Sequence, residues 1–284
     1  MSKEVQNIYD FHKIENLSEN KYIKELMSIN SKEEVSFGVA GGFCRNYMLN
    51  SEENTDIDII TDDVPYLENV FLKYFDTCTS KDHIITKFLN PQFKILDNTM
   101  HFAYGIFTSF IDEVNYVFPS PEFFDFTINL GAISIKDGYL YAPPITIFDI
   151  KHKIIRPCIL AFEEEESYRS VSLGLSLRAI RFALKYKMKI HEVALKSMHV
   201  LFSLQNYTGN VNDRTLYYYL SKIMKETQEF KKEYYNALRS LSFIDTDKYS
   251  TFESYFKNIT SKIKKDEFRT FDYIIEPNTY NQNF

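Results

Sequence analysis

Tryptophan is absent from this chain, cysteine is scarce, and long apolar runs are lacking. The three cysteines, Cys44, Cys78 and Cys158, form no Cys-x-x-Cys pair and have no histidines at the spacing of zinc ligands. This pattern disfavours a disulfide framework or a zinc site and indicates a reducing compartment. The first residues lack an apolar signal-peptide core, and no run reaches the roughly 18 apolar residues that cross a bilayer. We therefore expect a cytoplasmic protein.

The chain does have the composition of a globular protein. Its 284 residues are 44% hydrophobic and 25% charged, which allows one large or two modest domains. Residues 1–150 hold 11 basic and 23 acidic side chains, whereas residues 151–284 hold 22 and 16. The net charge of −6 argues against indiscriminate nucleic-acid binding. A polyanion would dock more easily on the basic half, although a lysine-rich helical surface would give the same counts.

Hydrophobic periodicity predicts an α+β protein. A mixed β-sheet with flanking helices is expected over residues 1–150, and an all-helical region over residues 151–284, with the boundary between Ile145 and Ser167. Expected helices cover residues 17–30, the segment that carries Arg45, and residues 63–75. Expected strands are 35–40, the segment of Asp56 and Asp58, 84–88, 93–96, 100–107, 110–118, 125–135 and 139–141. The last two form a hairpin around Lys136-Asp137-Gly138.

One segment combines a glycine turn, an arginine and two alternating aspartates. Gly41 and Gly42 let the backbone approach an anion closely, and Arg45 lies a few residues into the helix that follows. Asp56 and Asp58 alternate on a strand and therefore project to one side. Two neighbouring carboxylates suit Mg²⁺, and a pair of metals can stabilise the attacking and leaving oxygens of a displacement. Alone, however, an Asp-x-Asp strand is more often a solvated surface feature.

At this spacing the segment resembles the signature of the class II tRNA nucleotidyltransferase and poly(A) polymerase head domain, within the DNA polymerase β nucleotidyltransferase superfamily. The resemblance implies that Asp56 and Asp58 hold two Mg²⁺ ions and that Gly41, Gly42 and Arg45 hold the triphosphate of an NTP. It extends over about residues 35–190. The reaction that it implies is transfer of a nucleoside monophosphate to an acceptor hydroxyl, with release of pyrophosphate.

Two further segments resemble parts of the same head domain. Residues 124–129, Phe-Asp-Phe-Thr-Ile-Asn, are similar to the family's Arg-Arg-Asp-Phe-Thr-Ile-Asn motif, so Asp125 and Asn129 are expected to contact the ribose from one face of a strand. A third carboxylate completes the metal site in the family and can accept the proton of an attacking hydroxyl. Glu113 is the favoured residue for this role, and Asp112 takes it if the strand register shifts by one.

The neck of the family is matched further along the chain. Residues 148–156 are similar to the segment that leaves the head, and Leu177-Arg178-Ala179-Ile180-Arg181-Phe182-Ala183 is similar to the helix that opens the neck. The resemblance implies that Arg178 and Arg181, three apart on one helix face, contact a phosphate or a nucleobase. A salt-bridged helix face is the structural alternative.

The departures from the family limit what the resemblance implies. Phe123 and Phe124 replace two arginines, and Asn46 replaces an aspartate. The Glu-Asp-x-x-Arg template that selects C and then A is also missing, because Val171, Ser172 and Leu175 occupy its positions. Synthesis of CCA therefore cannot be inherited from the resemblance.

The sequence thus predicts a metal-dependent, template-independent nucleotidyltransferase that acts on an RNA 3′ end, with tRNA as the expected acceptor. The acceptor rests on family analogy and on the basic C-terminal half. One alternative is a toxin-like or phage-encoded transferase that modifies a protein or a small molecule. Another is a non-catalytic binding module with a degenerate site.

Overall fold

The structure is a computed structural model, and it divides the chain into two compact units, Met1–His152 and Lys153–Phe284. The structure describes residues 10–51, 56–61, 63–75, 93–95, 98–103, 106–111, 114–119, 124–158, 173–196, 198, 213–241, 243–244 and 248–262.

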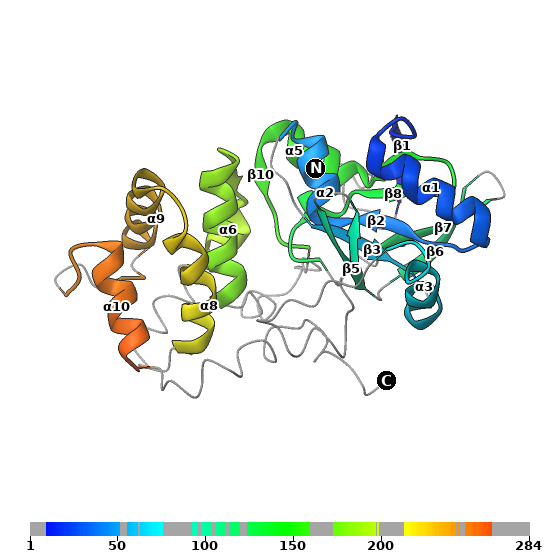
Figure 1. Cartoon of the computed structure of the whole chain (residues 1–284). Coiled ribbons are helices and arrows are strands. Elements are labelled where there is room, and N and C mark those ends of the chain that lie inside the picture. Colours follow the sequence, from blue (N-terminus) through cyan, green and yellow to red (C-terminus); the bar gives the residue numbers. More distant parts are fainter. Residues whose placement is uncertain are drawn as a thin grey trace, which may run out of the picture. The chain divides into compact units, whose positions relative to one another are not determined.

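The first unit is built on a seven-stranded mixed sheet, several strands of which are labelled in Figure 1. The strand order is β1-β9-β8-β2-β3-β5-β4. Strands β3 and β5 run parallel, and the other neighbouring pairs run antiparallel. The strands are β1 (His12–Asn16), β2 (Gly38–Ala40), β3 (Ile57–Ile60), β4 (Phe93–Ile95), β5 (Asn98–Ala103), β8 (Ala132–Ser134) and β9 (Tyr139–Ala142). This arrangement confirms the predicted α+β class.

Helices α1 (Lys21–Glu33), α2 (Gly41–Met48) and α3 (Val64–Phe71) contribute to one hydrophobic core with the sheet. Helix α1 begins at Asn20, whose side chain accepts hydrogen bonds from the backbone N–H groups of Tyr22 and Ile23. Helix α3 begins after Asp63, which caps the N–H of Tyr66 in the same way. The buried faces of α1 and α3 then pack with Ile57 and Ile59 of β3. The predicted helices over residues 17–30 and 63–75 are therefore present with shorter or shifted bounds.

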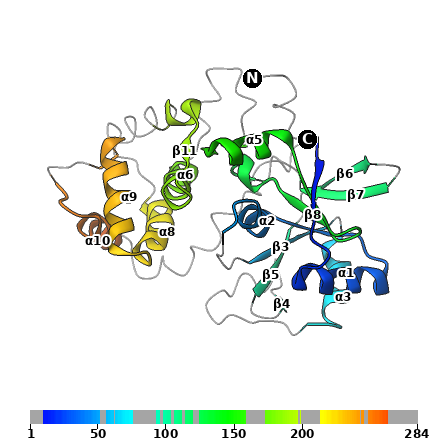
Figure 2. The same ribbon diagram turned by 90° about the horizontal axis from the view of Figure 1, so that it is seen from above.

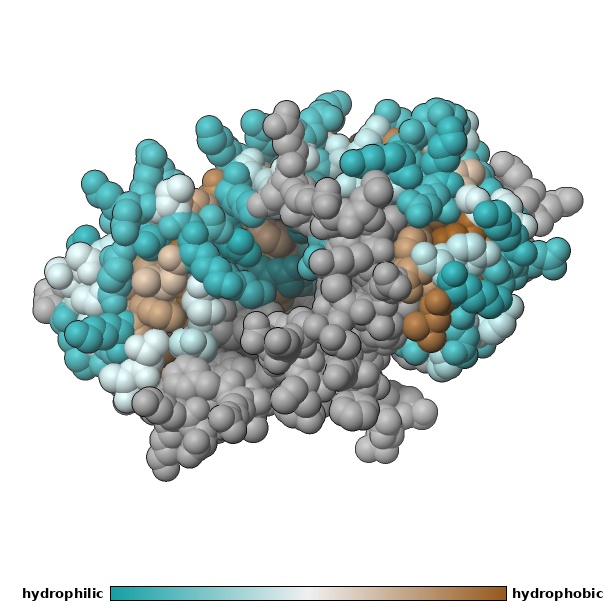
Figure 3. Space-filling model, viewed as in Figure 1, coloured by the Kyte–Doolittle hydropathy of each residue, from teal (hydrophilic) through white to brown (hydrophobic). Residues whose placement is uncertain are grey.

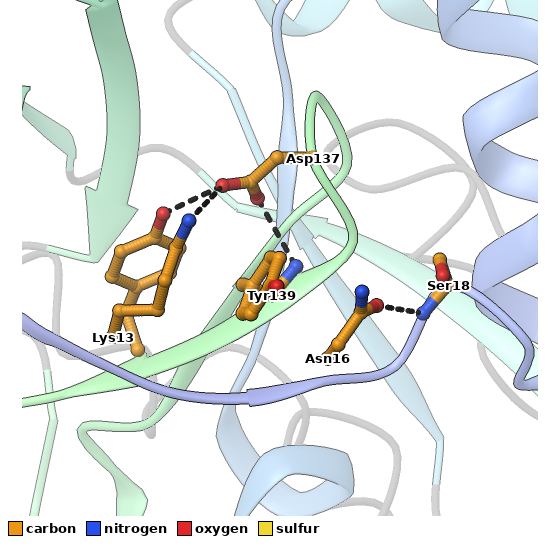
Figure 4. Close-up of polar contacts among 6 residues, drawn as sticks. Lys13, Asn16, Ser18, Asp137 and Tyr139 are labelled. Atoms are coloured by element: carbon orange, nitrogen blue, oxygen red, sulfur yellow. Dashed lines mark hydrogen bonds and ion pairs between the residues drawn. The ribbon is translucent and has the colours of Figure 1, made fainter. Parts of the chain in front are cut away.

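Strand β1 was not predicted from the sequence, because each of its residues is exposed and its side chains show no apolar alternation. Polar contacts and backbone pairing hold it to β9 (Figure 4). Lys13 Nζ lies 3.4 Å from Oδ2 of Asp137 and 3.8 Å from the ring centroid of Tyr139. The hydroxyl of Tyr141 donates to the same carboxylate oxygen over 2.7 Å.

Two predicted strands are wrong in extent. The strand predicted over residues 100–107 divides into β5 and β6 (Ile106–Ile111), and the strand predicted over 110–118 ends at Ile111 and resumes as β7 (Val114–Pro119). The chain reverses between them, because Ile111 pairs with Val114 in an antiparallel hairpin. Most residues of the two predicted strands, taken together, favour β-structure, so the sequence did not reveal this reversal. The strand predicted over 84–88 lies outside the described residues.

The strand predicted over residues 125–135 is also wrong in its first half. Thr127–Asn129 form a 3-10 helix, η3, and only Ala132–Ser134 form a strand, β8. The hydrogen bonds from the N–H of Asn129 to the carbonyl of Phe126 and from the N–H of Leu130 to the carbonyl of Thr127 make this tight turn. The predicted hairpin is confirmed, since β8 pairs antiparallel with β9. Helix α5 (Pro144–His152) follows and packs against η3.

The second unit is largely helical in its described residues. Its helices are α6 (Leu173–Lys185), α8 (Asp213–Met224), α9 (Gln228–Ser240) and α10 (Phe252–Lys262), and Figure 2 shows them from above. The hydroxyl of Tyr234 on α9 donates to the carbonyl of Leu177 on α6 over 2.9 Å. A short parallel pair, β10 (Ile154–Ile155) and β11 (Lys189–Ile190), was not predicted, because residues 151–284 were expected to be all-helical.

Hydrophilic side chains predominate among the coloured residues on the face drawn in Figure 3, interrupted by small hydrophobic areas. Tyr66 and Leu72 are among the exposed large hydrophobic residues. In the described part of the chain, no helix combines the length and the apolar character needed to span a membrane.

Candidate active site

Helix α2 begins at the glycine turn, where Gly41 adopts a left-handed conformation with φ of +69°. A Cβ atom at this position would lie 2.2 Å from Oδ2 of Asp58, and only glycine leaves room for that carboxylate. Ala40, which precedes the helix, provides no side-chain cap for it. The structure thus brings together the glycine turn and one of the two predicted metal-binding aspartates.

Asp58 occupies a polar position of β3, whose apolar positions are buried, and Asp56 directly precedes this strand. Ile57 and Ile59 are fully buried, whereas Asp56 is exposed and Asp58 is half-buried. In the backbone register, Asp58 lies opposite Ala40 of β2 and His101 of β5. The predicted alternation along this strand is therefore present.

The donor chemistry of these positions fits a hard divalent cation, because both residues supply carboxylate oxygens. Within the described residues, no group of three or more His, Cys, Asp or Glu side chains could hold a metal. Glu113 and Asp112, the two residues predicted for the third carboxylate, lie outside the described residues. A Mg²⁺ site at Asp56 and Asp58 stays a prediction.

Cys44 lies on α2 near this site as a buried thiol whose Sγ donates to the carbonyl of Val39 over 3.3 Å. Burial raises the pKa of Cys44 well above its ordinary value, and the nearby Asp58 carboxylate raises the pKa further. The thiol is therefore neutral near pH 7, which disfavours a nucleophilic role and a role as a thiolate ligand.

Arg45 is almost completely buried, with 5% of its surface exposed. Its Nε and Nη2 atoms donate to Oδ1 of Asn46 over 3.0 and 2.9 Å, and its Nη1 donates to Oδ1 of Asn129 over 3.0 Å. The guanidinium predicted to hold the triphosphate thus makes three hydrogen bonds to side-chain amides of the protein. In the sequence Asn46 stands out only as a departure from the family, and its contact with Arg45 was not predicted.

Asp125 and Asn129 lie together, as the sequence predicted, but for a different reason. Nδ2 of Asn129 donates to Oδ1 of Asp125, and the backbone N–H of Phe126 donates to the same oxygen. The η3 turn, rather than strand alternation, brings the two side chains into contact. Their expected role in ribose contact stays a prediction.

Helix α5 holds η3 from another direction through residues that sequence analysis did not select. The hydroxyl of Thr127 donates to Oδ2 of Asp149 over 2.6 Å, and the hydroxyl of Thr146 donates to the backbone carbonyl of Thr127 over 2.7 Å. Asp149 and Thr146 are fully buried. Thr127 and Asp149 lie inside the two motifs that resemble the family, so the motifs were the available signal.

Phe124, which replaces an arginine of the family motif, packs against Ala40 and Ile60. Both of these residues are buried at the ends of β2 and β3. An apolar contact therefore occupies the position expected for part of a basic lining. Phe123 lies outside the described residues.

In the second unit, Arg178 and Arg181 lie on α6. The guanidinium carbon of Arg178 lies 5.1 Å from the ring centroid of Phe182, and Nη2 of Arg181 lies 2.8 Å from Oε1 of Glu226. The structural alternative, a salt-bridged helix face, thus accounts for one contact of Arg181. The expected contacts of both arginines with nucleotide stay predictions.

This chain is similar to known proteins in structure but not in sequence. No protein-family model matches the sequence, and no curated protein matches it. Among solved structures, a CCA-adding enzyme in complex with ATP is similar, with a TM-score of 0.60 and 19% identity over 82% of this chain and 55% of that chain.

Two further similar structures contain tRNA. The Thermotoga maritima CCA-adding enzyme complexed with tRNA has a TM-score of 0.58 and 19% identity, over 82% of this chain and 55% of that one. A tRNA nucleotidyltransferase with a primer tRNA and an incoming ATP analog has a TM-score of 0.57 and 20% identity, over 78% of this chain and 62% of that one. At these identities the likeness shows the fold. The chain spans less than two thirds of the length of each of these structures.

Proposed function

We propose that this protein is a metal-dependent, template-independent nucleotidyltransferase that transfers a nucleoside monophosphate from an NTP to an acceptor hydroxyl and releases pyrophosphate. The observation that carries this proposal is the close approach of the Asp58 carboxylate to Gly41, at the start of a helix that follows a glycine turn. A nucleotide triphosphate near the turn would lie beside the aspartate strand. The similarity to CCA-adding enzymes, including one with ATP and one with CTP, supports the same reading.

Each part of the site has a proposed task. Asp56 and Asp58 hold Mg²⁺, with Glu113 as the proposed third carboxylate, and backbone N–H groups around Gly41 and Gly42 receive phosphate oxygens. Bound Mg²⁺ would neutralise charge on the triphosphate. Asp125 and Asn129 receive the sugar. Catalysis then comes chiefly from positioning and charge neutralisation.

The proposed acceptor is an RNA 3′ end, with tRNA as the first choice. Two of the similar structures contain tRNA, and residues 151–284 carry more basic than acidic side chains. Arg178 and Arg181 are the proposed nucleotide contacts in that half. A cytoplasmic location accords with such a substrate and stays a prediction.

The test is a transfer assay with the purified full chain. Each of the four labelled NTPs is incubated with the protein, Mg²⁺ and total RNA, and the label is followed by electrophoresis. We expect label on RNA, and we expect its loss in the double variant Asp56→Ala plus Asp58→Ala and on chelation of the metal. A matched control is Asp10→Ala, which removes an exposed carboxylate that pairs with His12 in an exposed contact.

A different acceptor is the second candidate function. The template that selects the base in the family is missing from the sequence, where Val171, Ser172 and Leu175 occupy its positions. Label on a protein or a small molecule, with RNA unlabelled, would favour a toxin-like or phage-encoded transferase. Absence of transfer with Mg²⁺ or Mn²⁺, combined with retained nucleotide binding, would favour a non-catalytic binding module.

A further inference from the structure

Three hydrogen-bonded side chains connect helix α2 with η3. Nη1 of Arg45 donates to Oδ1 of Asn129 over 3.0 Å, and Nδ2 of Asn129 donates to Oδ1 of Asp125. Arg45 and Asn129 are buried, with 5% and 3% of their surfaces exposed. The helix that starts at the glycine turn is thereby linked, through one buried and one partly buried hydrogen bond, to the pair of residues proposed to receive the sugar.

The two outer side chains, Arg45 and Asp125, dictate the orientation of the Asn129 amide between them. A guanidinium only donates hydrogen bonds, and a carboxylate only accepts them. Asn129 satisfies both neighbours only when Oδ1 faces Arg45 and Nδ2 faces Asp125. A flipped amide would set donor against donor and acceptor against acceptor. Arg45 therefore selects one of two amide orientations, and the amide in turn holds Asp125.

Arg45 is itself held in place by its neighbour. Oδ1 of Asn46 accepts hydrogen bonds from Nε and Nη2, so that three of the five N–H donors of the guanidinium are directed at amide oxygens. A buried guanidinium oriented in this way is suited to fixing other side chains. This arrangement differs from an arginine that projects from a helix toward a phosphate.

We propose that Arg45 is a positioning residue for sugar recognition, which orients Asn129 and Asp125 toward the ribose 2′-hydroxyl and so favours ribonucleotides over 2′-deoxynucleotides. This inference rests on the proposed function, which places the sugar at Asn129 and Asp125. A ribonucleotide loses hydrogen bonds when this pair is misoriented, whereas a 2′-deoxynucleotide has no 2′-hydroxyl to lose them from. The consequence of removing Arg45 is therefore selective for the sugar.

The experiment compares ATP with 2′-deoxy-ATP. Dissociation constants of both nucleotides are measured by calorimetry with Mg²⁺ on the full chain. For the wild type, kcat/KM is also measured with each nucleotide that it transfers. We expect Arg45→Met to lower the ribose preference about tenfold, as loss of one well-oriented hydrogen bond to a charged group predicts. Arg45→Lys should recover part of the preference, because one donor remains. The matched control is Lys24→Met, since Lys24 lies on α1 with 68% of its side chain exposed.

A second variant keeps the inference testable if Arg45→Met fails to fold. Asn129→Asp retains an acceptor for Arg45 but removes the donor to Asp125, and it should lower the ribose preference in the same way. Equal weakening of both nucleotides in these variants would overturn the inference and favour direct triphosphate contact. A wild type that binds both nucleotides equally, or binds neither, would overturn it as well. Ribose-selective binding that depends on Arg45, without any transfer, would defeat the proposed function alone.

Discussion

Two arginine sites, one in each unit, show how differently a guanidinium is used in this protein. Arg45 on α2 is buried and donates to the amide oxygens of Asn46 and Asn129. Arg181 on α6 is partly exposed and forms an ion pair with the carboxylate of Glu226. Amide acceptors add no negative charge, whereas a carboxylate offsets the charge of the arginine. The first contact thus orients side chains, and the second stabilises a contact between α6 and the turn that joins α8 and α9.

The largest effect expected in the first unit comes from the glycine turn. Gly41→Ala would force a Cβ toward Oδ2 of Asp58 and would strain a backbone with φ of +69°. We expect transfer to fall at least 100-fold, because a displaced carboxylate misplaces the reacting groups. Stability should fall by about 1–2 kcal/mol from the left-handed backbone alone. Initial rates and urea unfolding measure the two effects.

Gly138→Ala is the matched control for this variant. Gly138 also has a positive φ, +71°, and a Cβ there would lie 2.9 Å from Cβ of Ser18, in the turn between β8 and β9. It should lose similar stability and retain transfer. Equal loss of transfer in the two variants would mean that Gly41 acts only through folding.

The next effect tests the second unit. If Arg181 contacts nucleotide as proposed, Arg181→Met should lower kcat/KM about tenfold, the size expected for loss of one charged hydrogen bond. Glu226→Gln should change kcat/KM by less than about twofold and should cost only a few tenths of a kcal/mol of stability, because a partly exposed ion pair is screened by solvent. Equal loss of stability in both variants with unchanged kinetics would mean that Arg181 acts only through its ion pair with Glu226.

A smaller effect compares two threonine hydroxyls, one in each unit. Thr127→Val removes the hydrogen bond to the fully buried carboxylate of Asp149 and should lower stability by about 1–3 kcal/mol. Thr227→Ala removes the cap of α9, an exposed bond to the N–H of Phe230, and should cost about 1 kcal/mol. Urea unfolding measures both. A larger loss at Thr227 would contradict the view that η3 depends on its buried polar contacts.

The smallest effect concerns Glu33, outside both arginine sites. Lys73 and Tyr74 donate hydrogen bonds to its carboxylate and lower its pKa. The resulting stabilisation is present above the ordinary carboxyl pKa and is lost as the pH falls through the lower pKa of the folded protein. Glu33→Gln should therefore be slightly less stable than the wild type at pH 7 and equal to it in strong acid. Thermal unfolding across this pH range measures the difference.

The control for Glu33 is Glu19→Gln, whose ion pair with Lys24 is fully open to solvent, with 88% of the Glu19 side chain exposed. It should leave the stability at pH 7 almost unchanged, because an exposed ion pair is screened by solvent. A pH-independent difference for Glu33→Gln would show that the carboxylate acts through packing.

Much of the first unit could be predicted from local pattern. Asn20 and Asp63 cap α1 and α3, and the alternation of Ile57 and Ile59 with the aspartates identifies β3. Side-chain caps and strand alternation act over a few residues and are visible in a single sequence. Strand β1 could not be found in this way, because pairing with β9 rather than apolar burial holds it in place.

The amino-acid sequence by itself determined the α+β class, the glycine turn and the grouping of residues into motifs along the chain. Tertiary structure alone decided that Asp58 lies against Gly41, that η3 interrupts the predicted strand, and that Arg45 turns inward to Asn129. The physical reason is the separation in sequence over which each kind of interaction acts. Periodicity and capping are set by neighbours in sequence, whereas a buried donor such as Arg45 takes its partner from whichever acceptor the packed fold brings near, here 84 positions away.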